Sequence, residues 1–125
     1  MTGLTSQQLD HYKNKGYVSP VSALSSIEAK EIRDEIEKIE KNWPGALEGI
    51  NRNYIHLISP MLNKICLNKN ILDAVESVIG KDILICGTTL FIKDPKEKGF
   101  VSFHQDAKYI GLEPNNWVTV WVAIT

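Results

Sequence analysis

The stretch SFHQDAKYIGLEPNNWVTVWVAIT, residues 102–125, carries the features that decide the predicted fold. Its last part, residues 117–124, is a run of aromatic, β-branched and small apolar residues, which favours a β-strand. The Glu-Pro-Asn-Asn sequence just before that run predicts a turn. His104 and Asp106 stand two residues apart, and a strand would direct both side chains to the same side. The stretch therefore predicts a β-core that carries a candidate polar site.

Two segments upstream also have the composition of strands. Residues 82–93 read DILICGTTLFIK, which predicts one strand, or two strands with a bulge at Gly87. A charged loop follows at residues 94–99, and residues 101–105 return to a strand pattern. We therefore expect the β-core to occupy residues 81–125.

The beginning of the chain shows helical signals instead. Thr5-x-x-Gln8 and Ser25-x-x-Glu28 both match the capping box, in which each side chain of the pair accepts a hydrogen bond from a free backbone N–H group. Gly16 is placed to end the first helix, because glycine adopts the left-handed conformation at little cost. These signals predict two helices, the first ending at Gly16.

The second helix has an apolar stripe and is followed by shorter elements. It is expected to end near Lys41, and its isoleucines recur at helical spacing. Further short helices are predicted to begin at Pro60 and, with a cap at Asn70, to end at Gly80, whereas residues 46–59 fit no single pattern. The stripe consists of Ile27, Ile32, Ile36 and Ile39.

The order of these elements predicts the fold class. Helices occupy residues 1–80 and strands follow in residues 81–125, which indicates an α+β arrangement rather than alternating strand–helix–strand units. The chain has 125 residues, so we expect a single domain.

Composition excludes several classes of partner. The formal net charge is −1 without a clustered basic face, which argues against nucleic-acid binding. No window approaches the ~20 apolar residues that span a bilayer, and the N-terminus does not resemble a secretory signal. Cys66 and Cys86 have no metal-type spacing and are interpreted as free thiols. A cytoplasmic location is therefore expected.

The pair of His104 and Asp106 is the strongest chemical signal. An imidazole nitrogen and a carboxylate oxygen are two of the three ligands in the 2-His-1-carboxylate triad that holds Fe(II). The same spacing also fits two surface residues or a hydrogen-bonded pair, so it does not by itself define a metal site. A zinc hydrolase is less well supported, because no helix carries a histidine pair.

Three stretches together resemble the phytanoyl-CoA dioxygenase family. Residues 102–125 resemble its metal-binding segment, residues 4–32 resemble its first two helices with the short strand between them, and residues 71–95 resemble the helix and strand that lead into its core. Members are Fe(II)/2-oxoglutarate-dependent oxygenases. The resemblance implies that residues 81–125 are strands of an incomplete double-stranded β-helix, a cupin-like jelly roll.

The resemblance also implies roles for individual residues. His104 and Asp106 would be the iron ligands, and no further catalytic residue is implied. Three residues would line the 2-oxoglutarate pocket and one would border the substrate entrance. Three of the four have a plainer alternative: Lys93 as a solvated strand end, Trp121 as a core residue and Tyr109 as packing on the loop. The pocket residues are Lys93, Gln105 and Trp121, and the entrance residue is Tyr109.

The implied reaction is hydroxylation of a small organic or acyl substrate. O₂ decarboxylates 2-oxoglutarate to succinate and CO₂, an unactivated C–H bond of the substrate is hydroxylated, and ascorbate can support turnover. Related halogenases have a small residue in place of the carboxylate. The presence of Asp106 therefore favours hydroxylation.

One part of the family pattern is missing from the chain. Members carry a second iron histidine and a basic residue for 2-oxoglutarate later in the sequence, and His11 and His56 are poorly placed to substitute. The chain is therefore expected to be the N-terminal part of a longer oxygenase, a truncated fragment inactive or nearly so as given. The alternative is a non-enzymatic remnant or binding module that pairs strands with another chain, or self-associates through the edge strand 117–124.

Overall fold

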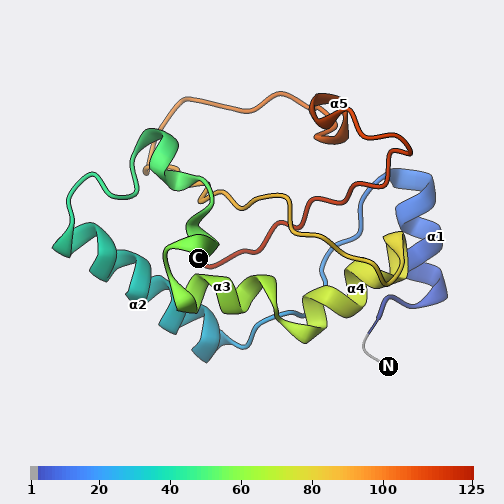
Figure 1. Cartoon of the computed structure of the whole chain (residues 1–125), viewed down its shortest axis with the longest axis horizontal. Coiled ribbons are helices and arrows are strands. Elements are labelled where there is room, and N and C mark those ends of the chain that lie inside the picture. Colours follow the sequence, from blue (N-terminus) through green and yellow to red (C-terminus); the bar gives the residue numbers. More distant parts are fainter. Residues whose placement is uncertain (1–2) are drawn as a thin grey trace.

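The computed structural model describes residues 3–125, and its regular structure is helical (Figure 1). Helices account for 46% of the residues. In chain order they are α1 (Ser6–Lys15), α2 (Ser26–Asn42), the 3-10 helices η1 (Gly49–Arg52) and η2 (Ile55–Leu57), α3 (Pro60–Cys66), α4 (Lys69–Ile79) and the short α5 (Ala107–Ile110). None of the helices within residues 3–125 has the length and apolar character that a membrane crossing requires.

The two capping boxes predicted from the sequence are confirmed at the starts of α1 and α2. Thr5 Oγ1 accepts from the Gln8 N–H at 3.2 Å, and Gln8 Oε1 accepts from the Thr5 N–H at 2.9 Å. Ser25 and Glu28 make the same reciprocal pair, at 3.2 and 2.7 Å. Gly16 ends α1 with a φ of 79°, as predicted. Both helix starts are therefore determined by four consecutive residues.

The next two helices begin at polar caps. Ser59 caps α3 and Pro60 occupies its first turn. The cap of α4 is Asn68 and not the predicted Asn70: the Asn68 side-chain oxygen accepts from the N–H groups of Asn70 at 2.9 Å and Ile71 at 3.3 Å. A cap side chain accepts from the N–H group of the second or third helical residue, and Asn68 accepts from both.

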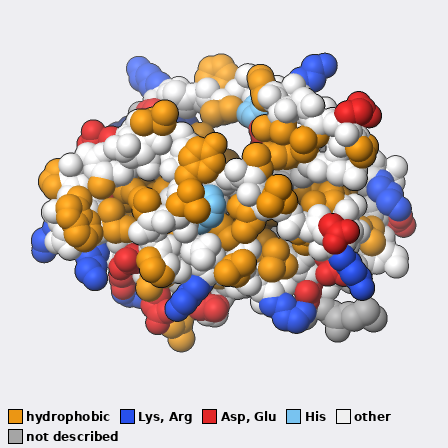
Figure 2. All heavy atoms as spheres, in the orientation of Figure 1, with side chains coloured by type: hydrophobic (Ala, Val, Ile, Leu, Met, Phe, Trp, Pro, Cys, Tyr) orange, Lys and Arg blue, Asp and Glu red, His pale blue; other side chains and the backbone are white. Residues whose placement is uncertain are grey.

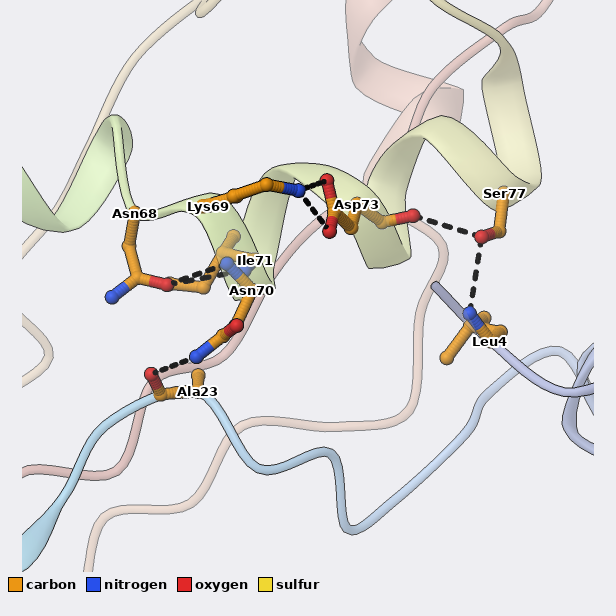
Figure 3. A network of polar contacts seen from close by, with 8 residues as sticks. All are labelled: Leu4, Ala23, Asn68, Lys69, Asn70, Ile71, Asp73 and Ser77. Atoms are coloured by element: carbon orange, nitrogen blue, oxygen red, sulfur yellow. Dashed lines mark hydrogen bonds and ion pairs between the residues drawn. The ribbon is translucent and has the colours of Figure 1, made fainter. Parts of the chain in front are cut away.

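Side-chain bonds from α4 hold the N-terminal segments of the chain (Figure 3). Ser77 Oγ accepts from the Leu4 N–H at 3.1 Å and donates to the Asp73 carbonyl at 2.8 Å. Asn70 Nδ2 donates to the Ala23 carbonyl at 3.3 Å. These contacts anchor the segments before α1 and before α2 on one helix.

The hydrophobic core lies among α2, η2 and α3. Leu62 on α3 is its least exposed member, at 1%. Ile124, near the C-terminus, packs against this cluster, and Figure 1 shows the C-terminal segment returning toward α3. The core therefore joins the C-terminal segment to α2 and α3. The buried cluster consists of Ile32, Ile39, Leu47, Ile55, Leu62 and Leu90.

The predicted fold class is wrong for the described residues. No sheet forms, and the strands expected at residues 82–93, 101–105 and 117–124 are absent, so no part of a double-stranded β-helix is seen. One isolated antiparallel bridge joins Asn53 and Thr89. A strand composition favours extended chain, but a sheet also requires a neighbouring strand with free N–H and C=O groups. In residues 117–125 no backbone group bonds to another described backbone group.

The segment of residues 81–93 keeps a strand-like alternation of burial without a sheet. Ile83 and Ile85 are half-buried, and after Gly87 the inward positions shift by one residue to Thr88, Leu90 and Ile92. A side chain at Gly87 would bring its Cβ to 3.2 Å from the Tyr54 ring. The shift falls at the position where a bulge was predicted. Backbone bonds from Tyr54 N–H to Thr88 O at 2.7 Å and from Leu90 N–H to Arg52 O at 2.9 Å hold this segment beside η1 and η2.

Candidate metal centre

A turn, and not a strand, brings His104 and Asp106 together. The N–H groups of Lys108 and Tyr109 donate to the carbonyls of Gln105 at 3.1 Å and Asp106 at 2.9 Å, which forms the first turn of α5. His104 Nε2 lies 2.9 Å from Asp106 Oδ1, and each side chain is 38% exposed. The two groups meet at the surface, on the chain that enters α5.

The ring of His104 is held from both sides. Nδ1 lies 2.7 Å from the Ser102 carbonyl oxygen, which can only accept, so Nδ1 carries a proton and donates it. Nε2 then faces the carboxylate. The Tyr109 ring packs on the imidazole in an edge-type arrangement, with the ring centroids 6.0 Å apart and the planes at 66°. A histidine whose Nδ1–H is bonded to a carbonyl presents Nε2 to a metal.

The hydrogen-bond partners of His104 favour its charged form. Both ring nitrogens face oxygen acceptors, and only the imidazolium can donate to both. The pKa of His104 is accordingly raised above its ordinary value, first by the bond to the Ser102 carbonyl and then by the Asp106 carboxylate. A metal ligand must be the neutral imidazole. Between Nε2 and Oδ1, a cation would therefore displace a proton.

The second carboxylate oxygen of Asp106 is also occupied. Thr119 Oγ1 donates to Asp106 Oδ2 at 2.5 Å, and Trp117 Nε1 donates to Thr119 Oγ1 at 3.0 Å. These two residues were not predicted from the sequence. The sequence did offer one signal: Trp117 and Thr119 are two residues apart, and in extended chain such residues direct their side chains to the same side.

The donor atoms fit ferrous iron, but they are too few to complete a site. An imidazole nitrogen and a carboxylate oxygen match two positions of the facial triad. No group of three or more His, Cys, Asp or Glu side chains with metal-binding geometry occurs in residues 3–125. His11 packs on Tyr17, with ring centroids 5.2 Å apart, and His56 Nδ1 lies 2.8 Å from Thr88 Oγ1. His104 and Asp106 therefore form two thirds of a ligand set.

The residues predicted to line a 2-oxoglutarate pocket are not hydrogen-bonded to the pair. Within the described chain, the side chains of Lys93, Gln105 and Trp121 make no hydrogen bond to either ligand candidate, and Lys93 and Gln105 are exposed. Trp121 is 72% exposed and packs on Phe91 at 5.1 Å between centroids, so it is not a core residue. Their roles toward 2-oxoglutarate stay predictions.

Comparison with known proteins places the chain in a family of oxygenases. The model of the family "Phytanoyl-CoA dioxygenase (PhyH)" matches residues 12–125. The chain therefore belongs to the phytanoyl-CoA dioxygenase family, which confirms the resemblance seen in the sequence. Neither the curated proteins nor the solved structures include a match to the chain.

Proposed function

We propose that the chain contributes two iron ligands to a non-haem Fe(II)/2-oxoglutarate-dependent dioxygenase. The observation that supports this most directly is the 2.9 Å approach of His104 Nε2 and Asp106 Oδ1 in a chain that matches the dioxygenase family. Iron bound there would supply the reductive activation of O₂ that 2-oxoglutarate decarboxylation and substrate hydroxylation require. On this proposal the substrate is a small organic or acyl compound, and ascorbate supports turnover.

The chain's own residues have separate tasks in this proposal. His104 binds through Nε2, because the Ser102 carbonyl occupies Nδ1. Asp106 binds through Oδ1. Tyr109, whose ring lies against His104, borders the substrate entrance. Lys93 pairs with a carboxylate of 2-oxoglutarate, and Gln105 and Trp121 line its pocket.

In addition to His104 and Asp106, a complete site needs a third iron ligand and a basic residue that binds 2-oxoglutarate. On this proposal residues 1–125 supply only part of the site and by themselves turn over little or no substrate. We also propose a cytoplasmic location, which the two free thiols of Cys66 and Cys86 support.

The proposal is tested by anaerobic calorimetric titration of the 125-residue chain with Fe(II) or Mn(II). Two ligands predict weak binding, which His104→Ala and Asp106→Ala should abolish and His11→Ala should leave unchanged. Equal binding by the parent chain and both pair variants would remove the pair from metal binding. Tight stoichiometric binding, or succinate release at rates typical of an enzyme, would contradict the incomplete ligand set.

A second candidate function, a β-strand binding module, is favoured by the unpaired backbone of residues 117–125. Exposed apolar side chains accompany it, including Trp121 at 72% and Phe103 at 110% exposure. Figure 2 shows hydrophobic side chains gathered across the middle of one face. Extended chain with free N–H and C=O groups can add a strand from a partner or from a second copy.

Sedimentation across a range of protein concentrations tests whether the chain self-associates, as the second function predicts. Association that grows with concentration and is weakened by Val120→Lys would support the module, because a charge at this exposed position opposes pairing. Ile27→Lys, at a 71% exposed position in α2, introduces the same charge and is the matched control; it should not alter association. A chain that stays monomeric throughout would exclude pairing with a second copy.

A further inference from the structure

A chain of three polar contacts ends at the candidate ligands. It runs from the Trp117 indole N–H to the Thr119 hydroxyl, from that hydroxyl to Asp106 Oδ2, and from Asp106 Oδ1 to His104 Nε2, with lengths of 3.0, 2.5 and 2.9 Å. We propose that Thr119, oriented by Trp117, is a positioning residue that reserves Oδ1 of Asp106 as the only carboxylate oxygen available to the metal. The inference rests on the proposed function.

The direction of these bonds follows from the chemistry of the groups. An indole N–H can only donate, so the Thr119 oxygen accepts from Trp117. The single hydroxyl proton of Thr119 is then left for Asp106, whose ionised carboxylate can only accept. The distance of 2.5 Å is at the short end for a hydroxyl that donates to a carboxylate. The indole therefore fixes the direction in which Thr119 donates.

The bond selects one mode of metal binding. A carboxylate whose two oxygens are both free can bind a cation through one oxygen or through both. With Thr119 on Oδ2, Oδ1 remains directed at His104 Nε2. Binding through one oxygen leaves more positions open on the metal for other ligands, as the facial triad requires.

The same bond joins two segments that have few other restraints. Thr119 and Asp106 are thirteen positions apart, and Asp106 directly precedes a helix of only four residues. The Asp106 side chain is 38% exposed, so packing alone does not hold its rotamer. Outer hydrogen bonds to metal ligands typically change metal affinity by about 10–100-fold. A substantial part of the affinity should therefore depend on Thr119.

The metal test uses the 125-residue chain and Mn(II) alone. Thr119→Val keeps the shape and removes the hydroxyl, and it should weaken Mn(II) binding about tenfold or more. Thr119→Ser should restore it, and Trp117→Phe should have a smaller effect. Thr89→Val is the matched control, because Thr89 donates to Asn53 instead, at 2.7 Å. Melting temperatures verify that each variant folds.

A second measurement does not depend on metal. NMR couplings between the α and β protons of Asp106 report its rotamer in the metal-free chain. We expect one rotamer in the parent chain and in Thr119→Ser, and averaging over several in Thr119→Val. Identical couplings in all three would overturn the positioning role of Thr119, whatever Mn(II) does. A rotamer change together with no Mn(II) binding by the parent chain would reject the proposed function and not the positioning role.

Discussion

Residues 3–80 and residues 81–125 differ in how their backbone N–H and C=O groups are paired. The first region forms α1 to α4, whose polar caps lie within a few residues of the groups they satisfy. The second region has the composition of strands but forms only the four-residue α5 and one isolated bridge. A helix is completed by its own chain, whereas an extended segment depends on a partner. The contrast explains why the predicted helices formed and the predicted strands did not.

Amide hydrogen exchange measures this contrast directly and should show its largest effect. Amides in the middle of α2 and α4 are bonded within the helix and should exchange more slowly than those of residues 117–125 by roughly three orders of magnitude. The measurement is exchange followed by NMR or mass spectrometry. Strong protection in residues 117–125 would show that their N–H groups have partners and would remove the contrast.

Truncation of one leucine in each region should separate their contributions to stability. Leu62→Ala, at 1% exposure, should lower the free energy of unfolding by about 2–5 kcal/mol, because it leaves a cavity in the core. Leu84→Ala, at 90% exposure in the extended region, should change it by less than about 0.5 kcal/mol. Urea denaturation followed by circular dichroism gives both values. A large effect of Leu84→Ala would mean that the extended region is packed.

Removal of a helix cap should have an intermediate effect. Ser25→Ala removes the side chain that accepts from the Glu28 N–H at 3.2 Å and should cost about 1 kcal/mol of stability. The same denaturation experiment measures it. Ser22→Ala, an exposed serine before the cap, is the matched control and should be close to neutral. Equal effects of the two variants would show that the capping box does not determine where α2 begins.

Titration of one group in each region should give the smallest effects, with opposite signs. The pKa of Glu28 is lowered, first by the Ser25 backbone N–H and then by its hydroxyl. Its contribution to stability is therefore present above the pKa it has when unfolded and is lost as the pH falls through the lowered value. The pKa of His104 is raised, so its contribution is present below its unfolded pKa and is lost as the pH rises through the raised value.

NMR titration of both side chains checks these signs. Ser25→Ala should raise the pKa of Glu28. Asp106→Asn should lower the pKa of His104 only in part, because the Ser102 carbonyl is the larger cause of its shift. An unchanged pKa of His104 in Asp106→Asn would contradict the contact between the two side chains.

The sequence predicted most where the determinants are local. The boxes at Thr5 and Ser25 located the starts of α1 and α2, and Gly16 and Gly80 marked the ends of α1 and α4. The cap of α4 was placed two residues late, because Asn68 and Asn70 are both suitable caps and only three-dimensional contacts distinguish them. Residues 46–59 formed two 3-10 helices for which the pattern gave no signal.

The candidate site was predicted for one reason and formed by another. His104 and Asp106 were expected to meet because a strand directs residues two apart to one side, but the first turn of α5 brings them together. Strand pairing of residues 117–124 could not be predicted correctly, because composition does not reveal whether a neighbour is available. Thr119 was missed because its partner lies thirteen positions away.

The place of Leu90 in the core has a consequence for biosynthesis. Every other fully buried member of the core cluster comes before residue 63, so Leu90 is the last to leave the ribosome. The helices formed from residues 6–79 can assemble while the remainder is still being translated, because their contacts are largely local. During that interval the apolar surface that Leu90 later covers is exposed to solvent. A chaperone that binds the nascent chain would bind it at this surface.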